Sequence, residues 1–245
     1  MERAIVPAPN PPSTWLQLPL RFDVARMQRD SDQFAAEEWI SHFNTGAYDH
    51  GWSCVPLRSA GGQAGHIMPI DGVAYADTPQ LAHCPCLREV LASFACEINA
   101  ARLLALAPGA LIRAHRDAGT SLADGLIRIH IPIHTSPQVL FSIDGESVHF
   151  TAGHAWYMDA SCLHAVHNEG ATPRIHLVLD CITNAWLEAL FAAAGFVPKA
   201  VHKYGDPGIH DGNVRAIIAQ LRLSPSPASL TLAGELAALA DGRAA

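Results

Sequence analysis

The residues of this chain best suited to chemistry are two histidines and an aspartate. His115 and Asp117 stand two positions apart, and His164 follows 49 residues after His115. Alternate residues of a β-strand point to the same face, so both side chains could reach one metal ion while Arg116 points away. Two histidines and a carboxylate form the facial triad that holds Fe(II) and leaves positions open for oxygen and a chelating co-substrate. The same ligands suit Mn or Ni, and three common residue types could also stand at this spacing by chance.

Arg174 is the second candidate residue. It lies 10 positions after His164, in an apolar run that is typical of a β-strand. A buried arginine needs an anionic partner, and a guanidinium group binds carboxylates through paired hydrogen bonds. Near a metal site it could hold the far carboxylate of a dicarboxylic acid, whereas the alternative is a salt bridge to an acidic residue inside the fold. Together with the triad, Arg174 predicts an iron- and 2-oxoglutarate-dependent oxygenase.

A third polar group lies in the segment 128–134. Arg128, His130, Pro132 and His134 alternate with isoleucines, so they share one face of a predicted strand. This pattern predicts a polar pocket lined by the inward face. The alternative is that these residues form the solvent-facing side of an edge strand.

Short, apolar and often β-branched segments separated by turn residues fill residues 100–182. Eight strands at this spacing predict a double-sheet jelly roll of the cupin type, also called a double-stranded β-helix, with flanking helices. The predicted strands are 101–107, 110–115, 126–134, 138–143, 146–150, 154–159, 163–168 and 173–181.

The flanking regions have a different pattern. Residues 1–20 are Pro-rich and predict a loosely held arm, while 22–42 predicts helix, with Ser31 or Asp32 capping a separate helix inside it. Residues 52–58 predict a strand followed by a loop at Gly61-Gly62. Further helices are expected at 86–98, 185–196, 214–223 and 229–241. We therefore expect three regions, an N-terminal region packing on the barrel at 1–99, the catalytic jelly roll at 100–182 and a C-terminal helical region at 183–245.

The composition of the chain argues against a nucleic-acid partner, a membrane-spanning segment and secretion. The 245 residues are 49% hydrophobic and 16% charged, with a formal net charge of −7 and no Lys/Arg cluster, which argues against a nucleic-acid partner. No apolar run reaches the roughly 18 residues needed to cross a membrane, and no signal core follows the N-terminus. The six cysteines are expected to stay reduced in a cytoplasmic protein. The segment His83–Cys86 resembles a zinc motif, but a single Cys-x-Cys is weak support for zinc.

These residues together resemble the aspartyl/asparaginyl β-hydroxylase family, including its bacterial cis-4-proline hydroxylases. The resemblance covers roughly residues 95–182, and its motifs occur in family order. The matching segments are Leu106–Ala110, His115–Asp117, Arg128–Pro132, Gly153–Asp159, His164–Asn168 and Pro173–Asp180.

The resemblance implies a role for each matching residue. His115, Asp117 and His164 would be the iron ligands, Arg174 would bind the distal carboxylate of 2-oxoglutarate, and His130 would help to hold its 1-carboxylate end. Arg128 would meet a substrate carboxylate, and Trp156 could wall the substrate pocket, although a tryptophan on such a strand is more often a core residue. Vertebrate members have glycine where this chain has Asp117, which places the chain with the bacterial members that keep the full triad. His154 departs from the family, whose members often have glutamate there.

The expected activity is hydroxylation of an amino acid, free or within a peptide or natural product, with release of succinate and CO₂. One alternative is another cupin-type metalloenzyme that does not use 2-oxoglutarate. A second is a non-catalytic jelly-roll sensor of a metal or small molecule. The expected partner is a small-molecule or peptide substrate, and the C-terminal helices could form a homodimer surface.

Overall fold

The computed structural model describes residues 14–68, 70, 72–198, 203–206 and 208–242. The chain divides into two compact units, one of residues 1–197 and one of residues 198–245. All the sequence motifs named above belong to the first unit. Each unit is described by itself.

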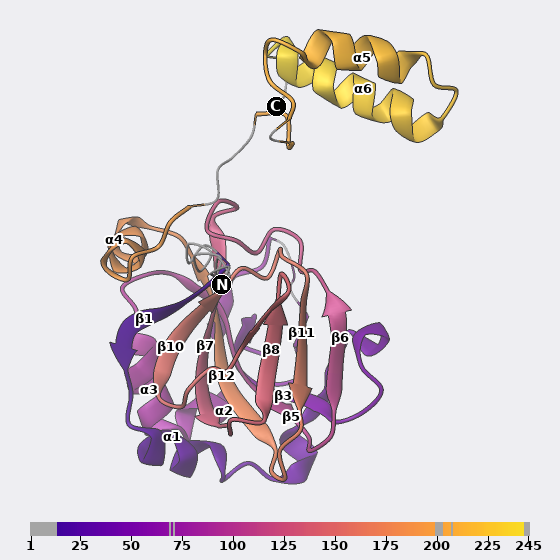
Figure 1. The fold of residues 1–245 in the computed structure, drawn as a ribbon. Coiled ribbons are helices and arrows are strands. Elements are labelled where there is room, and N and C mark those ends of the chain that lie inside the picture. The colour runs from indigo at the N-terminus through magenta and orange to yellow at the C-terminus, as the bar shows by residue number, and fades with distance from the viewer. Residues whose placement is uncertain (1–13, 69, 71, 199–202, 207, 243–245) are drawn as a thin grey trace, which may run out of the picture. The chain divides into compact units, whose positions relative to one another are not determined.

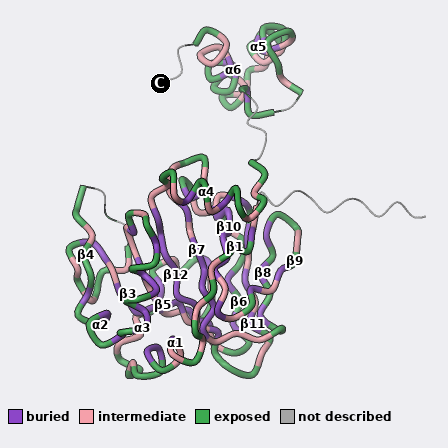
Figure 2. The backbone as a smooth tube through the Cα atoms, turned by 90° about the vertical axis from the view of Figure 1, so that its left-hand side faces the viewer, coloured by how far each residue is buried: buried purple, intermediate pink, exposed green. Residues whose placement is uncertain are grey.

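The eight strands predicted from the sequence are all present, with ends shifted by a few residues at most. Their alternating pattern is reflected in burial, and Figure 2 shows that buried positions follow these strands. The strands are β5 (Ile98–Leu106), β6 (Leu111–His115), β7 (Leu126–His134), β8 (Val139–Ile143), β9 (Glu146–Val148), β10 (His154–Met158), β11 (His164–Asn168) and β12 (Arg174–Ile182).

These strands form the two sheets of a jelly roll, which confirms the predicted fold class (Figure 1). Four further strands join the larger sheet, β1 (Trp15–Arg21), β2 (Ile40–Ser41), β3 (Trp52–Ala60) and β4 (Tyr75–Asp77). The larger sheet has the order β1-β10-β7-β12-β5-β3-β2, with β4 paired to β3, and the smaller has the order β6-β11-β8-β9. Strand β7 lies between β10 and β12, inside the larger sheet, so the edge-strand interpretation of its polar face is wrong.

The two faces of β7 show how the larger sheet is used. Its isoleucines, Ile129 and Ile131 among them, are fully buried in the main core. That core also contains side chains from four helices, α1 (Val24–Ser31), α2 (Pro79–Ala82), α3 (Pro85–Ala92) and α4 (Ala185–Ala193). Arg128 and His130 take the alternate positions and line a cavity. A second core cluster contains Phe141, Trp156 and Val166, which come from strands of both sheets. The alternation along β7 therefore separates the structural core from the cavity.

The N-terminal segment is part of the sheet. Strand β1 (Trp15–Arg21) pairs with β10 and buries Leu16 and Leu18, so the predicted loose arm is wrong for these residues. Residues 1–13 of that prediction lie outside the described residues. Apolar burial against the core fixes this strand despite the proline-rich sequence before it.

The predicted helix over 22–42 is only partly correct. Helix α1 (Val24–Ser31) begins after Asp23, whose carboxylate accepts the N–H of Arg26, and it ends at Ser31. The chain continues through a 3₁₀ turn, η1 (Ala36–Glu38), into strand β2 (Ile40–Ser41). Neither Ser31 nor Asp32 caps a second helix, because η1 starts after Ala35 and the Ser31 hydroxyl donates to the Gln28 carbonyl.

A second set of elements completes the larger sheet and its cover. The turn η2 (Thr45–Ala47) leads to β3 (Trp52–Ala60), which confirms the predicted strand, and then come β4 (Tyr75–Asp77), α2 (Pro79–Ala82) and α3 (Pro85–Ala92). Helix α3 ends at Ala92, so the predicted helix over 86–98 is too long at its C-terminal end, and β5 begins at Ile98. The buried Asp30 carboxylate accepts the N–H of Leu87 and so satisfies a first-turn donor of α3.

The cysteines of the His83–Cys86 segment belong to this packing. Cys84 and Cys86 are buried in the main core, and burial raises the pKa of the Cys84 thiol to about 12. Among the residues that the structure describes, this segment is not part of any group of three or more metal-ligating side chains. The two thiols therefore serve as small apolar core residues.

The predicted C-terminal helices are present as α4 (Ala185–Ala193), α5 (Val214–Arg222) and α6 (Pro227–Ala240). The region predicted at 183–245 is divided, because α4 buries Leu187 and Phe191 in the core of the first unit. Helices α5 and α6 pack on each other around a small core of their own, which includes Val214 and Leu236. No helix within the described ranges has the length and apolar character required to span a membrane.

The packing around β7 gives a stability prediction. Ile131 is fully buried, so Ile131→Ala is expected to lower the free energy of unfolding of the first unit by about 2–5 kcal/mol. All five tryptophans lie in this unit, so urea unfolding followed by tryptophan fluorescence measures the change. Leu140→Ala, on the exposed side of β8, is the matched control and is expected to cost about 0.5 kcal/mol or less. Equal effects of the two substitutions would contradict this description of the core.

Candidate metal centre and active-site cavity

His115, Asp117 and His164 come together at adjacent ends of two strands of the smaller sheet. His115 is the last residue of β6 and His164 the first of β11, and the two are directly opposite in the antiparallel register. Each of the three residues offers a ligand atom, and these atoms lie within 4.8 Å of one another. Within the described ranges this is the one such group. The two-histidine, one-carboxylate set suits Fe(II) and related divalent ions.

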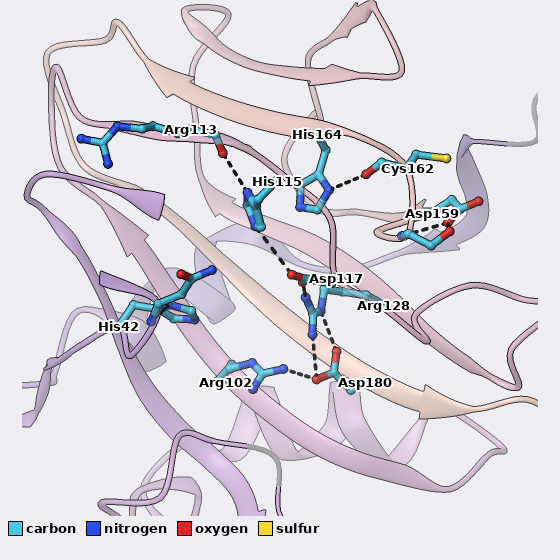
Figure 3. A network of polar contacts seen from close by, with 12 residues as sticks. His42, Arg102, Arg113, His115, Asp117, Arg128, Asp159, Cys162, His164 and Asp180 are labelled. Carbon is cyan, nitrogen blue, oxygen red and sulfur yellow. Dashed lines mark hydrogen bonds and ion pairs between the residues drawn. The ribbon is translucent and has the colours of Figure 1, made fainter. Parts of the chain in front are cut away.

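The imidazole rings are held in the tautomer that a metal requires. Nδ1 of His115 donates to the Arg113 carbonyl at 2.8 Å, and Nδ1 of His164 donates to the Cys162 carbonyl at 3.0 Å (Figure 3). A carbonyl only accepts, so Nε2 of each neutral ring keeps a free lone pair. Burial lowers the pKa of His164, which favours the neutral form that binds metal.

Asp117 is fixed on both its backbone and its side chain. Its N–H donates to the Ala160 carbonyl at 2.8 Å. One carboxylate oxygen, Oδ2, accepts a hydrogen bond from Arg128, while the other, Oδ1, lies 3.7 Å from Nε2 of His115. The carboxylate therefore has one oxygen committed to the protein and one beside the candidate metal ligands. Arg116 donates to the Ser161 carbonyl at 2.9 Å and is not a member of this group.

A cavity of about 430 Å³ contains this triad. Its wall includes side chains from both sheets and from the segments that precede β3 and β4. Besides the triad, the cavity is lined by His42, Trp52, Arg58, His66, Met68, Tyr75, Arg102, Arg128, His130, Phe141, Arg174 and Asp180, among others. The volume is in the range of small-molecule sites.

Arg174 is a buried cation that pairs with no acidic side chain in the described part of the chain. Its side chain is 1% exposed, and no acidic group of the described residues forms an ion pair with it. Nε is buried without a hydrogen-bond partner, and the guanidinium carbon lies 5.8 Å from the centre of the Phe141 ring. Burial lowers the pKa of Arg174 to about 9, which still leaves it charged at neutral pH. Among the residues that the structure describes, Arg174 therefore lacks the internal salt bridge considered for it, and an anionic ligand in the cavity would supply the partner.

His130 and His176 lie beside Arg174 as a pair of neutral rings. Their Nδ1 atoms are 3.4 Å apart, and Nε2 of each ring is buried without a partner. Burial lowers the pKa of both rings well below the usual range, and the nearby Arg174 adds to the effect. His130 lines the cavity, so it can offer a neutral hydrogen-bonding group to a ligand there.

A network of charged side chains lies on the larger sheet opposite the triad (Figure 3). Arg128 Nε donates to Asp180 Oδ1 at 2.7 Å, and Arg128 Nη2 donates to Asp180 Oδ2 at 3.2 Å. Arg102 also donates to Asp180 Oδ2. Burial alone would raise the pKa of Asp180, but Arg102 and Arg128 lower it to about 2, so the group is ionised.

Trp156 is not brought to the cavity. Its ring stacks on Phe150 at 4.9 Å between centroids and lies 6.2 Å from the ring of Trp15. Its indole N–H donates to the Thr151 carbonyl at 3.3 Å. The residue is a buried core side chain between the two sheets and does not line the cavity.

No role was predicted from the sequence for three of the charged or histidine residues that line the cavity, His42, Arg102 and Asp180. Arg102 and Asp180 occupy largely apolar strands, and the one signal for Asp180 is that it shares a strand face with Arg174 and His176. His42 follows β2 and stacks on Trp52 with 3.5 Å between ring centroids. Its Nδ1 accepts the N–H of Asn44 at 3.3 Å, and burial, together with the nearby Arg102, lowers its pKa to about 3. His42 is therefore a neutral ring whose Nε2 carries the hydrogen.

The chain resembles proteins of known activity over most of the barrel unit. It is 25% identical over 172 residues to an L-proline cis-4-hydroxylase of Rhizobium meliloti (strain 1021), covering 69% of this chain and 61% of that protein. It is 26% identical over 173 residues to an L-proline cis-3-hydroxylase 1 of a Streptomyces species, covering 66% of this chain and 57% of that protein. The chain thus spans about 60% of the length of these curated relatives.

A crystal structure of an oxidoreductase of the 2OG-Fe(II) oxygenase family from Burkholderia pseudomallei has a TM-score of 0.44 and 14% identity, covering 73% of this chain and 82% of that one. The family model of aspartyl/asparaginyl β-hydroxylases matches residues 20–184, which include the triad, Arg128, His130 and Arg174. From this match over most of the chain, the protein belongs to the aspartyl/asparaginyl β-hydroxylase family.

Proposed function

We propose that this protein is an Fe(II)- and 2-oxoglutarate-dependent hydroxylase of an amino acid or of an amino-acid residue in a peptide or natural product. In the proposed reaction, one oxygen atom of O₂ enters the substrate as hydroxyl and the other enters succinate, with release of CO₂. The observation that carries the proposal is the buried Arg174, which has no acidic partner among the described residues and lies in the same cavity as the His115, Asp117 and His164 triad.

The donor set fits the proposed metal and co-substrate. His115, Asp117 and His164 would hold iron on one side, which leaves room for a chelating ligand. Arg174 would pair with the distal carboxylate of 2-oxoglutarate, and His130 would donate or accept a hydrogen bond at its other end. Iron bound there would supply the oxidising power that hydroxylation of an aliphatic C–H bond requires. The protein would position that C–H bond and exclude water.

The proposed substrate end of the cavity carries charged and aromatic side chains. Arg102 and Arg128 are neutralised in part by Asp180, and the buried His42 ring offers an N–H donor beside them. We propose that Arg128 contacts a carboxylate of the substrate, in keeping with the amino-acid substrates named for the two relatives. Trp156 has no part in this proposal, because its ring is packed in the core.

A metalloenzyme that does not use 2-oxoglutarate is the second candidate. It would use the same triad but would leave the charge of Arg174 without an anionic partner, beside the Phe141 ring and the neutral rings of His130 and His176. A non-catalytic sensor is the third, and the open metal positions of a complete triad do not favour it.

We further propose a cytoplasmic location, and the six free cysteines support it.

Co-substrate turnover tests the proposed function. We expect the aerobic protein with Fe(II), 2-oxoglutarate and ascorbate to release succinate in the presence of L-proline or another free amino acid from a panel of amino acids and short peptides. Asp117→Ala should abolish this release, because it removes one of the triad's ligands. Succinate release that persists in Asp117→Ala would remove the triad from the mechanism. A lack of release with the whole panel in iron-loaded protein would favour the sensor.

A further inference from the structure

Asp180 lies at the centre of a buried ion network that the proposed iron and 2-oxoglutarate roles do not use. It is 7% exposed and sits on β12, six positions after Arg174 on the same face of the strand. The antiparallel register places Asp180 directly opposite Arg128 on β7. Its position is therefore fixed by the pairing of two central strands of the larger sheet.

The contacts of Arg128 connect Asp180 to the triad. Two nitrogens of the guanidinium group, Nε and Nη2, donate hydrogen bonds to the two carboxylate oxygens of Asp180 at 2.7 and 3.2 Å. A bidentate pair of this kind fixes the plane of the guanidinium group as well as its position. The third nitrogen, Nη1, donates to Oδ2 of Asp117. Asp180 thus orients the guanidinium group of Arg128, and Arg128 in turn orients the carboxylate of Asp117.

These contacts determine which carboxylate oxygen of Asp117 lies near the other candidate metal ligands. With Oδ2 held by Arg128, the remaining oxygen, Oδ1, is the one near Nε2 of His115. A hydrogen bond to one oxygen of a metal-binding carboxylate fixes which oxygen faces the metal. The charges also balance, because Arg102 and Arg128 carry two positive charges and Asp117 and Asp180 two negative ones.

We propose that Asp180 is a positioning residue for the metal centre, which holds Arg128 so that Arg128 presents one oxygen of Asp117 to the metal. This inference rests on the proposed function, since it assumes that the triad binds a metal. Without the charge of Asp180, Arg128 loses its bidentate anchor and an uncompensated cation stands beside the triad. Both effects weaken metal binding.

Metal affinity in three variants tests this role. Asp180→Asn keeps the shape of the side chain, and we expect it to weaken Co(II) binding by about 10- to 100-fold, the usual range for a group that orients a metal ligand. The measurement is an anaerobic titration of the full chain with Co(II), followed by visible absorption, whose band shape also reports the ligand geometry. Glu89→Gln, which breaks the exposed pair with Arg26, is the matched control and should leave the affinity unchanged.

Arg128→Lys separates positioning from charge. Lysine keeps the positive charge but cannot grip Asp180 through two nitrogens and bond Asp117 through a third. We expect weaker Co(II) binding and an altered absorption band, whereas a purely electrostatic role predicts wild-type affinity. If Asp180→Asn fails to fold, as judged by circular dichroism, Arg128→Lys decides the question in the same titration.

The possible failures are distinguishable. If wild-type protein binds no Co(II), or binds it equally well after Asp117→Ala, the proposed function fails along with this inference. If wild-type binding depends on Asp117 but Asp180→Asn and Arg128→Lys both bind Co(II) as tightly as wild type, only the positioning role is overturned.

Discussion

Replacing Arg174 with methionine is expected to weaken the binding of 2-oxoglutarate by about 2–4 kcal/mol, which is roughly 30- to 1,000-fold in Kd. The reason is that the distal carboxylate would lose a buried, charged partner that no other described group of the cavity replaces. The same substitution should leave the ligand-free protein at least as stable as wild type. Arg174 is 1% exposed and unpaired, and a buried unpaired charge destabilises a fold.

Calorimetric titration with 2-oxoglutarate, using Mn(II)-loaded protein to prevent turnover, measures the first effect, and urea unfolding measures the second. Arg26→Met is the matched control, because Arg26 is exposed, is paired with Glu89 and does not line the cavity. It should change neither quantity. If Arg174→Met bound 2-oxoglutarate as tightly as wild type, Arg174 would not be the co-substrate's partner, and a metalloenzyme that does not use 2-oxoglutarate would become the better account.

Replacing His164 with alanine is expected to weaken metal binding by more than about 100-fold. Loss of a group that only orients a ligand typically lowers metal affinity by about 10- to 100-fold, and loss of a direct ligand should cost more. His164 is buried at the start of β11, with its Nδ1 bonded to Cys162 and its Nε2 free for metal. Metal content after dialysis against Fe(II) under argon, together with succinate release, reports the loss.

His167 on the same strand provides a matched control. It is partly exposed and its Nδ1 lies 3.0 Å from Glu169, outside the triad. His167→Ala should retain metal and activity. Loss of metal in both variants, or in neither, would contradict the assignment of His164 as a ligand.

Strand positions and the two faces of β7 could be predicted from the sequence because alternation reports burial directly. Ile129 and Ile131 pack in the core while Arg128 and His130 line the cavity, as the spacing indicates. The helix predicted over 22–42 was too long for a tertiary reason. Asp30 at the end of α1 is buried and caps α3, which a local pattern does not reveal. The strand β1 was missed because its pairing with β10 joins segments more than 130 residues apart.

The candidate site was predicted in part. The triad and Arg174 are chemically distinctive residues in a recognisable order, and the structure brings the three ligands within 4.8 Å. The ion network was not predicted, because it depends on the register of three strands. Asp180 lies opposite Arg128, and Arg102 lies opposite Val178, which is two positions before Asp180 on β12. Arg128 itself has a contact that the sequence did not indicate, its hydrogen bond to Asp117. Trp156 was predicted at the substrate pocket from its motif, but its aromatic neighbours hold it in the core.

The most direct test of the central proposal is an anaerobic titration of the wild-type protein with Fe(II) and then 2-oxoglutarate, recorded by visible absorption. A chelating 2-keto acid on Fe(II) gives a metal-to-ligand charge-transfer band, so we expect a band that saturates with one equivalent of each and is lost in Asp117→Ala. Protein that is shown to bind Fe(II) through the triad but develops no band with 2-oxoglutarate would contradict the proposed co-substrate and with it the proposed hydroxylase.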